Sequence, residues 1–148
     1  MQKVVILYGT ESGNAEMAAD DIASTLEAAG IAGAVSSMEE FRVDELSQAQ
    51  RVVLVTSTYG EGEMPDTAIS FFDSLNEVRP DLSTLSFAAF GLGDATYKTY
   101  NNAIDTLVGT VAELGASQFG ETGKHDAASG KPLTDTAVNW TKETFSIT

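Results

Sequence analysis

The chain alternates two kinds of apolar pattern: short continuous runs, and longer stretches in which apolar residues recur every three or four positions. Continuous runs are typical of strands buried on both faces of a sheet, and the recurring pattern is typical of helices packed on one side. The runs predict strands at 4–7, 31–35, 51–57, 85–92 and 116–120, and the recurring pattern predicts helices at 13–29, 65–75, 100–114 and 133–145. The weakest run, 31–35, contains a glycine and suits an edge strand, and the acidic stretch 38–46 is expected to form a helical turn.

Strands that alternate with helices predict a doubly wound α/β domain, with a parallel sheet, right-handed crossovers and helices on both faces. The length of 148 residues suits a single domain, 1–148. We expect five strands in the order 2-1-3-4-5. In such sheets the ligand lies beyond the carboxyl ends of the strands, where the strand order reverses between strands 1 and 3. This rule brings together the loops 9–14, 57–66 and 91–100.

The first loop, Thr10-Glu11-Ser12-Gly13-Asn14-Ala15, follows a strand and opens a helix. The first amides of a helix are unpaired and carry the positive end of the macrodipole, so the arrangement predicts an anion site. The loop offers neutral donors and no Lys or Arg, which favours one phosphate monoester over a triphosphate with Mg²⁺. It lacks both the Gly-Lys-Ser/Thr ending of nucleoside-triphosphate loops and the dinucleotide fingerprint. An ordinary Ser/Thr N-cap without a ligand is an equal alternative for this stretch alone.

The other two loops each place a tyrosine at the ligand end of a strand. They have the sequences Ser57-Thr58-Tyr59-Gly60-Glu61-Gly62-Glu63 and Gly91-Leu92-Gly93-Asp94-Ala95-Thr96-Tyr97. Either tyrosine alone is more typical of a core or rim position. Two aromatic rings that converge beside a phosphate site favour a flat ring system held between them, because offset stacking adds to the gain from burial.

Composition narrows the function classes. Eight Lys and Arg against 22 Asp and Glu give a formal net charge of −14, which repels nucleic acid and anionic membranes and favours encounter with basic protein surfaces. Solubility alone is the alternative explanation of such a charge. The absence of cysteine excludes disulfides and thiolate chemistry, and the single histidine and dispersed carboxylates do not suggest a metal site. We expect a cytoplasmic monomer with no signal peptide and no membrane span.

Together the three loops resemble the flavodoxin family along nearly the whole chain. Thr10 to Ala15 is similar to the phosphate loop of that family. The loop from Ser57 to Gly62, with Asp66, is similar to the aromatic loop in the FMN domains of diflavin reductases such as sulfite reductase, and the stretch 90–101 is similar to their second stacking loop. The short passage from the last strand to the last helix is that of a short-chain member. The Tyr-Gly-Glu-Gly sequence is closer to MioC-like proteins and reductase domains than to the tryptophan loop of other short-chain flavodoxins.

This resemblance implies a flavodoxin-like three-layer sandwich with bound FMN. It implies that Thr10, Ser12, Asn14 and Ala15 hold the phosphate, with amides from Glu11 and Gly13 and a hydroxyl from Ser57. Tyr97 would stack on one face of the isoalloxazine ring and Tyr59 would cover the other. The positions implied at the ring edge and the ribityl chain are Thr58, Gly60, Glu61, Gly62, Gly91, Leu92, Gly93, Asp94, Tyr100 and Asn101. No catalytic residue is implied.

The function implied is that of a low-potential one-electron carrier and not an enzyme. Its partners would be basic surfaces of an NAD(P)H-dependent reductase and of acceptor redox proteins. The electron chemistry belongs to the flavin and its tuning to the protein. Glu61, Glu63, Asp66 and Asp94 crowd the flavin end of the chain, and their negative charge would oppose the addition of electrons.

Two other functions are alternatives. An FMN-dependent NAD(P)H:quinone oxidoreductase would use a related fold, although the short loops leave little room for a substrate pocket. A response-regulator receiver shares the strand order but needs an acidic pair after strand 1, an Asp after strand 3 and a Lys after strand 5. Here those strands end in Tyr8-Gly9, Thr56-Ser57 and Gly120-Glu121, which disfavours a receiver.

Overall fold

A parallel sheet runs through the middle of the domain. The structure, a computed structural model, describes residues 3–10, 13–58, 64–93 and 102–147. The strands are β1 (Lys3–Gly9), β2 (Ala32–Ser37), β3 (Arg51–Ser57), β4 (Ser86–Gly93), β5 (Ser117–Gln118) and β6 (Gly123–Asp126). They follow the order β2-β1-β3-β4-β5, with β6 also paired to β4, and every pair is parallel. The predicted strand order is therefore confirmed.

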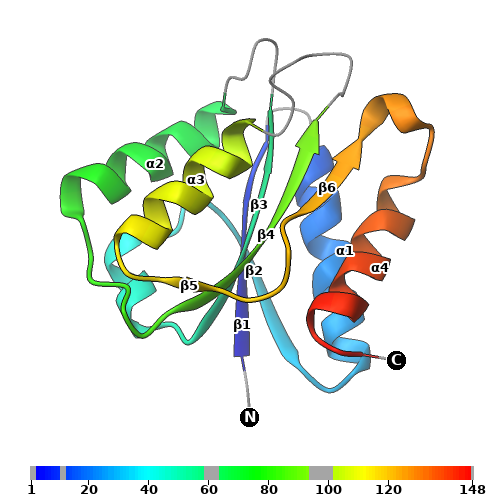
Figure 1. Cartoon of the computed structure of the whole chain (residues 1–148), viewed down its shortest axis with the longest axis horizontal. Helices are drawn as coiled ribbons and strands as arrows, with labels where there is room; N and C mark the ends of the chain where they lie inside the picture. The colour runs from blue at the N-terminus through cyan, green and yellow to red at the C-terminus, as the bar shows by residue number, and fades with distance from the viewer. Residues whose placement is uncertain (1–2, 11–12, 59–63, 94–101, 148) are drawn as a thin grey trace.

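Two layers of helices cover the sheet, one on each face (Figure 1). The helices are α1 (Asn14–Ala28), α2 (Asp66–Val78), α3 (Asn102–Glu113) and α4 (Leu133–Thr144), with 3₁₀ turns η1 (Val43–Gln48) and η2 (Ala127–Ser129). Helices α1 and α4 lie on one face, and α2 and α3 lie on the other. The expected three-layer sandwich is confirmed, and none of the described helices is long and apolar enough to cross a bilayer.

The central strand β3 shows how the sequence pattern produces these layers. Residues 52–57 are all buried, because both faces of this strand are covered. Side chains alternate between the faces of a strand, so Val53 and Val55 join the core under α1 and α4, while Val52 and Leu54 join the core under α2 and α3. A continuous apolar run therefore supplies two separate cores at once.

The fifth strand position differs from the prediction, because two short segments occupy it. The run 116–120 contains β5, and the chain then turns at Gly120, whose φ is +70°, before β6 pairs with the carboxyl half of β4. Strand β6 approaches closely: a Cβ added at Gly123 would lie 2.5 Å from ring atoms of both Phe90 and Trp140. Those two rings pack with centroids 5.3 Å apart, and Trp140 lies partly buried against the core under α1 and α4.

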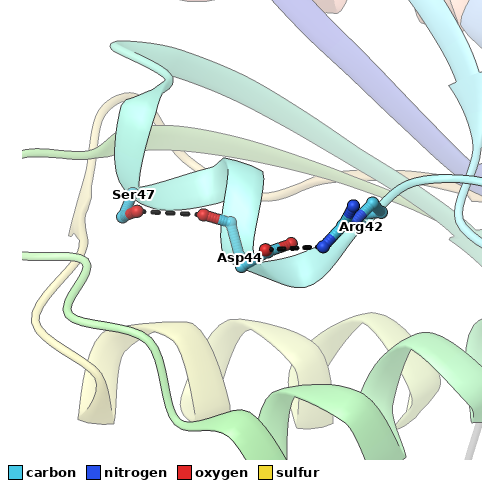
Figure 2. Close-up of polar contacts among 3 residues, drawn as sticks. All are labelled: Arg42, Asp44 and Ser47. Atoms are coloured by element: carbon cyan, nitrogen blue, oxygen red, sulfur yellow. Dashed lines mark hydrogen bonds and ion pairs between the residues drawn. The ribbon is translucent and has the colours of Figure 1, made fainter.

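The acidic stretch after β2 forms η1, slightly later than predicted. Figure 2 shows its polar contacts: the Arg42 guanidinium pairs with the Asp44 carboxylate at 3.0 Å, and the Ser47 hydroxyl donates to the Asp44 carbonyl at 3.0 Å. Both members of the ion pair are exposed, so it adds little stability. Burial of Val43 and Leu46 against the α2 core holds this turn in place.

Candidate functional site

Three strands end side by side at the carboxyl edge of the sheet. The strand register places Gly9 of β1 beside Thr56 of β3, and Thr56 beside Gly91 of β4. Figure 1 shows β1, β3 and β4 ending at the same edge, which is also where α1 begins. The three predicted loops therefore start from one rim, at the point where the strand order reverses.

The amino terminus of α1 opens onto this rim. Gly13 is its N-cap residue, with a left-handed φ of +91°, and no side chain of the described residues caps the helix there. A Ser/Thr N-cap, the alternative for this stretch, is thus not what begins α1. The Gly13 N–H donates to Thr10 Oγ1 at 3.0 Å, so the loop closes on itself ahead of the helix. Asn14 is exposed and Ala15 buried at the first two helical positions, whose amides have no intrahelical partner.

Ser57, the last residue of β3, carries an unusual hydroxyl. Its side chain is buried, and Oγ finds no hydrogen-bond partner in the part of the chain that the structure describes. Strand alternation places Ser57 on the same face as Val53 and Val55, which pack in the α1 core. The unpartnered hydroxyl and the uncapped start of α1 thus share one face of the sheet. A buried hydroxyl without a partner costs about 1–3 kcal/mol, so the Ser57 hydroxyl is a candidate donor to a ligand oxygen.

Thr58 joins the second loop to the third. Its N–H donates to the Leu92 carbonyl at 2.9 Å, and its Oγ1 accepts the Ala103 N–H at 3.0 Å, near the start of α3. These two bonds fix the first residue after β3 relative to β4 and α3. Gly91 and Leu92 are buried and Gly93 is half-buried at the end of β4, so the described part of the third loop also begins at the rim.

Much of the predicted site lies outside the described residues. The predicted residues concerned are Glu11, Ser12, Tyr59, Gly60, Glu61, Gly62, Asp94, Tyr97, Tyr100 and Asn101. Their roles stay predictions. Asp66 is described: it is exposed in the first turn of α2. Among the described residues, no three His, Asp or Glu side chains gather in a way that could hold a metal ion.

Two contacts at the rim involve residues that sequence reasoning missed. The Thr67 hydroxyl, on α2, accepts the Thr10 N–H at 2.9 Å and donates to the Thr10 carbonyl at 3.2 Å. The Tyr8 hydroxyl donates to Glu16 Oε2 at 3.0 Å, tying β1 to the first turn of α1. Burial and this hydrogen bond raise the pKa of Tyr8. No sequence signal joins Thr67 to Thr10, because the two are 57 positions apart.

The chain matches the model of one known protein family. The flavodoxin family model matches residues 6–140, a span that includes all three rim loops. The chain belongs to the flavodoxin family. The resemblance found in the sequence is thereby confirmed, and the receiver alternative is set aside.

Individual relatives place this flavodoxin more closely. Protein MioC of Escherichia coli O157:H7 is 33% identical over 140 residues, which cover 95% of this chain and 94% of that protein. The NADPH sulfite reductase flavoprotein alpha-component of Bacillus subtilis is 36% identical over 119 residues, or 80% of this chain and 20% of that protein. The crystal structure of oxidised flavodoxin 2 from Bacillus cereus has a TM-score of 0.86 and 29% identity, covering 97% of this chain and 98% of that one. The chain thus spans nearly all of MioC but about a fifth of the reductase component.

FMN is the cofactor of the flavodoxin family, and the described residues fit its phosphate. The buried Ser57 hydroxyl lacks a partner among the described residues, and α1 lies on the same face of the sheet and begins at Gly13 without a described side-chain cap. No Lys or Arg occurs between Lys3 and Arg42, so the first loop contributes neutral donors only. Such a donor set suits one phosphate monoester better than a polyphosphate.

Proposed function

We propose that this flavodoxin is a low-potential one-electron carrier that uses non-covalently bound FMN. The observation that carries the proposal is the Ser57 hydroxyl, which is buried on the face where α1 begins and has no partner among the residues that the structure describes. Bound FMN supplies the redox chemistry, since a flavin takes up and releases electrons singly.

The described residues suggest how the phosphate would be held. The Ser57 hydroxyl would donate to a phosphate oxygen, and so gain a hydrogen bond that the described part of the chain does not supply. The amides of Asn14 and Ala15 would donate from the start of α1, where the macrodipole favours an anion. Thr10 would contribute through its side chain, because its backbone N–H and carbonyl are both bonded to Thr67.

The remaining predicted contacts complete the proposed binding site. Tyr59 and Tyr97 would cover the two faces of the ring, and Ser12 would add a hydroxyl to the phosphate loop. Ring-edge and ribityl contacts would come from the predicted positions of the second and third loops. Thr58 supports this role by position, because its bonds to Leu92 and Ala103 hold the start of the second loop against the third.

The proposed partners are the basic surfaces of a reductase and of acceptor redox proteins. We propose that the protein itself is a monomer in the cytoplasm. The formal charge of −14 would steer such encounters at low ionic strength. The similarity to the NADPH sulfite reductase flavoprotein alpha-component supports a reductase as electron donor. Exposed carboxylates around the rim, Asp66 among them, would both attract the partner and disfavour added electrons.

Spectroscopy and titration test the proposal directly. We expect the purified protein to be yellow, or its apoprotein to bind added FMN stoichiometrically, and to accept two electrons in separate one-electron steps during potentiometric reduction. A protein that stays colourless and does not bind FMN would refute the cofactor assignment.

A second assay separates a carrier from a quinone oxidoreductase. The FMN-loaded protein is mixed with NADPH and a quinone, with and without an NADPH-dependent flavoprotein reductase. A carrier should consume almost no NADPH alone and should pass electrons onward once the reductase is present. Rapid NADPH consumption by the protein alone would establish the enzyme alternative in its place.

A further inference from the structure

The side chain of Thr67 binds both backbone polar groups of one residue in the first loop. Its Oγ1 accepts the Thr10 N–H at 2.9 Å and donates to the Thr10 carbonyl at 3.2 Å. A hydroxyl can play both parts at once, as one donor and an acceptor with two lone pairs. These contacts join α2 to the loop after β1, and they are partly buried.

The first turn of α2 is seated directly against the end of β1. A Cβ added at Gly9 would lie 2.7 Å from Ala68 Cβ, 3.1 Å from Met38 Sδ and 3.2 Å from Thr56 Oγ1. Thr56 Oγ1 also lies 3.3 Å from the Gly9 carbonyl, to which it donates. The backbone just before the first loop is therefore held on the face that carries α2, opposite the face where α1 begins.

Thr10 is thus held from two sides. On the α2 side, the Thr67 hydroxyl binds the backbone N–H and carbonyl of Thr10. On the α1 side, Oγ1 of Thr10 accepts the Gly13 N–H at the start of the helix. The backbone N–H of Thr10 is thereby bonded, so the Thr10 backbone has no donor left for a phosphate oxygen, and its contacts with Thr67 serve to fix the loop.

We infer that Thr67 is a positioning residue for the phosphate loop: from α2, it sets the loop in its phosphate-binding shape before any ligand arrives. The inference rests on the proposed FMN site. A loop that is ordered before binding loses less conformational entropy when the ligand binds, so its affinity for the ligand is higher. This gain in affinity concerns the part of the ligand that the loop would contact, which is the phosphate and not the ring.

The test compares FMN with riboflavin, which has the same ring system and lacks the phosphate. Thr67→Val keeps the shape of the side chain and removes both hydrogen bonds, while Thr67→Ser keeps the hydroxyl. We expect Thr67→Val to weaken FMN binding about tenfold, with riboflavin binding unchanged within about twofold, and Thr67→Ser to stay near the wild type. Dissociation constants are measured by flavin fluorescence on titration with apoprotein.

Thr25→Val is the matched control. Its hydroxyl is also partly buried on a helix, but it donates to the Asp21 carbonyl within α1, about 16 Å along the helix from Asn14. It should change neither dissociation constant. Unchanged FMN affinity in Thr67→Val would overturn the inference, and so would an equal loss for FMN and riboflavin, which would indicate a general structural role.

A measurement on the unmodified apoprotein keeps the inference falsifiable if Thr67→Val does not fold. The Thr10 amide should exchange with solvent at least about tenfold more slowly than an unbonded loop amide, because Thr67 and not a ligand accepts its proton. Exchange at the rate of an unbonded amide would overturn the inference. If the wild type binds no FMN at all, the proposed function fails, and the exchange experiment still tests the Thr67 contact separately.

Discussion

At the scale of single residues, the side-chain hydroxyls at the rim differ in whether they have a hydrogen-bond partner. Thr58 and Thr67 use their hydroxyls to hold neighbouring backbone in place, one at Ala103 and the other at Thr10. Ser57 differs, because its buried hydroxyl holds nothing within the described residues. Native proteins leave few such groups, and each one calls for a physical explanation, such as a bound ligand.

The Ser57 hydroxyl should therefore lower apoprotein stability while raising ligand affinity. For Ser57→Ala we expect the free energy of unfolding of the apoprotein to rise by about 1 kcal/mol, because a buried unpaired group is removed. FMN affinity should fall about tenfold or more, because a hydrogen bond to a charged phosphate is lost. Urea unfolding and FMN titration measure the two effects.

A control for Ser57→Ala is Ser47→Ala in η1, where the side chain is exposed and its hydroxyl donates to the Asp44 carbonyl. It should leave FMN affinity at the wild-type value. If Ser57→Ala destabilised the apoprotein and kept full affinity, the hydroxyl would be serving the fold, and its assignment to the phosphate would be wrong.

At the scale of elements, strand β6 was missed because its own residues carry no strand signal. Its sequence, Gly123-Lys124-His125-Asp126, has no apolar run and no alternation. The strand forms because β4 runs beyond the last residue that β5 pairs, which leaves backbone groups at its carboxyl half for β6 to bond. The well-predicted strands are those that carry their own burial signal, such as β3 at 51–57.

Two glycines give opposite predictions for the same substitution. Gly123→Ala should lower the free energy of unfolding by about 1–3 kcal/mol, because its Cβ would meet Phe90 and Trp140 at 2.5 Å. Gly109→Ala, in α3, meets nothing within 4 Å and should raise it by about 0.5–1 kcal/mol, because glycine is a poor helix former. Chemical denaturation of both variants measures the difference, and equal effects would contradict the packing described for β6.

At the scale of the whole molecule, the charge of −14 bears on partners and on redox potential together. A carboxylate about 10 Å from the flavin, at an effective dielectric near 40, would oppose an added negative charge by about 0.8 kcal/mol. That corresponds to some tens of millivolts for one electron. Charges at the far end of a helix act more weakly, because salt screens them over about 8–10 Å.

Neutralising one rim carboxylate should consequently raise the potential of the second one-electron step. We expect Asp66→Asn, at the start of α2, to raise it by some tens of millivolts. Glu77→Gln makes the same charge change about 16 Å further along the same helix and should have a much smaller effect. Potentiometric titration of both variants measures the two shifts in potential. Equal shifts would mean that the net charge of the protein, and not the position of each carboxylate, sets the potential of the flavin.

The sequence by itself determined the strand order, the two helix layers and the rim from which the three loops start. This was possible because strands buried on both faces have continuous apolar runs, and helices packed on one side have apolar residues every three or four positions. Hydroxyl- and glycine-rich loops also pointed to a phosphate at that rim. Only the tertiary structure decided that Ser57 lacks a partner within the described ranges, that β6 completes the edge of β4, and that Thr67 holds Thr10. These facts depend on which polar groups, distant in the sequence, meet in the folded chain, and a local sequence pattern does not specify that.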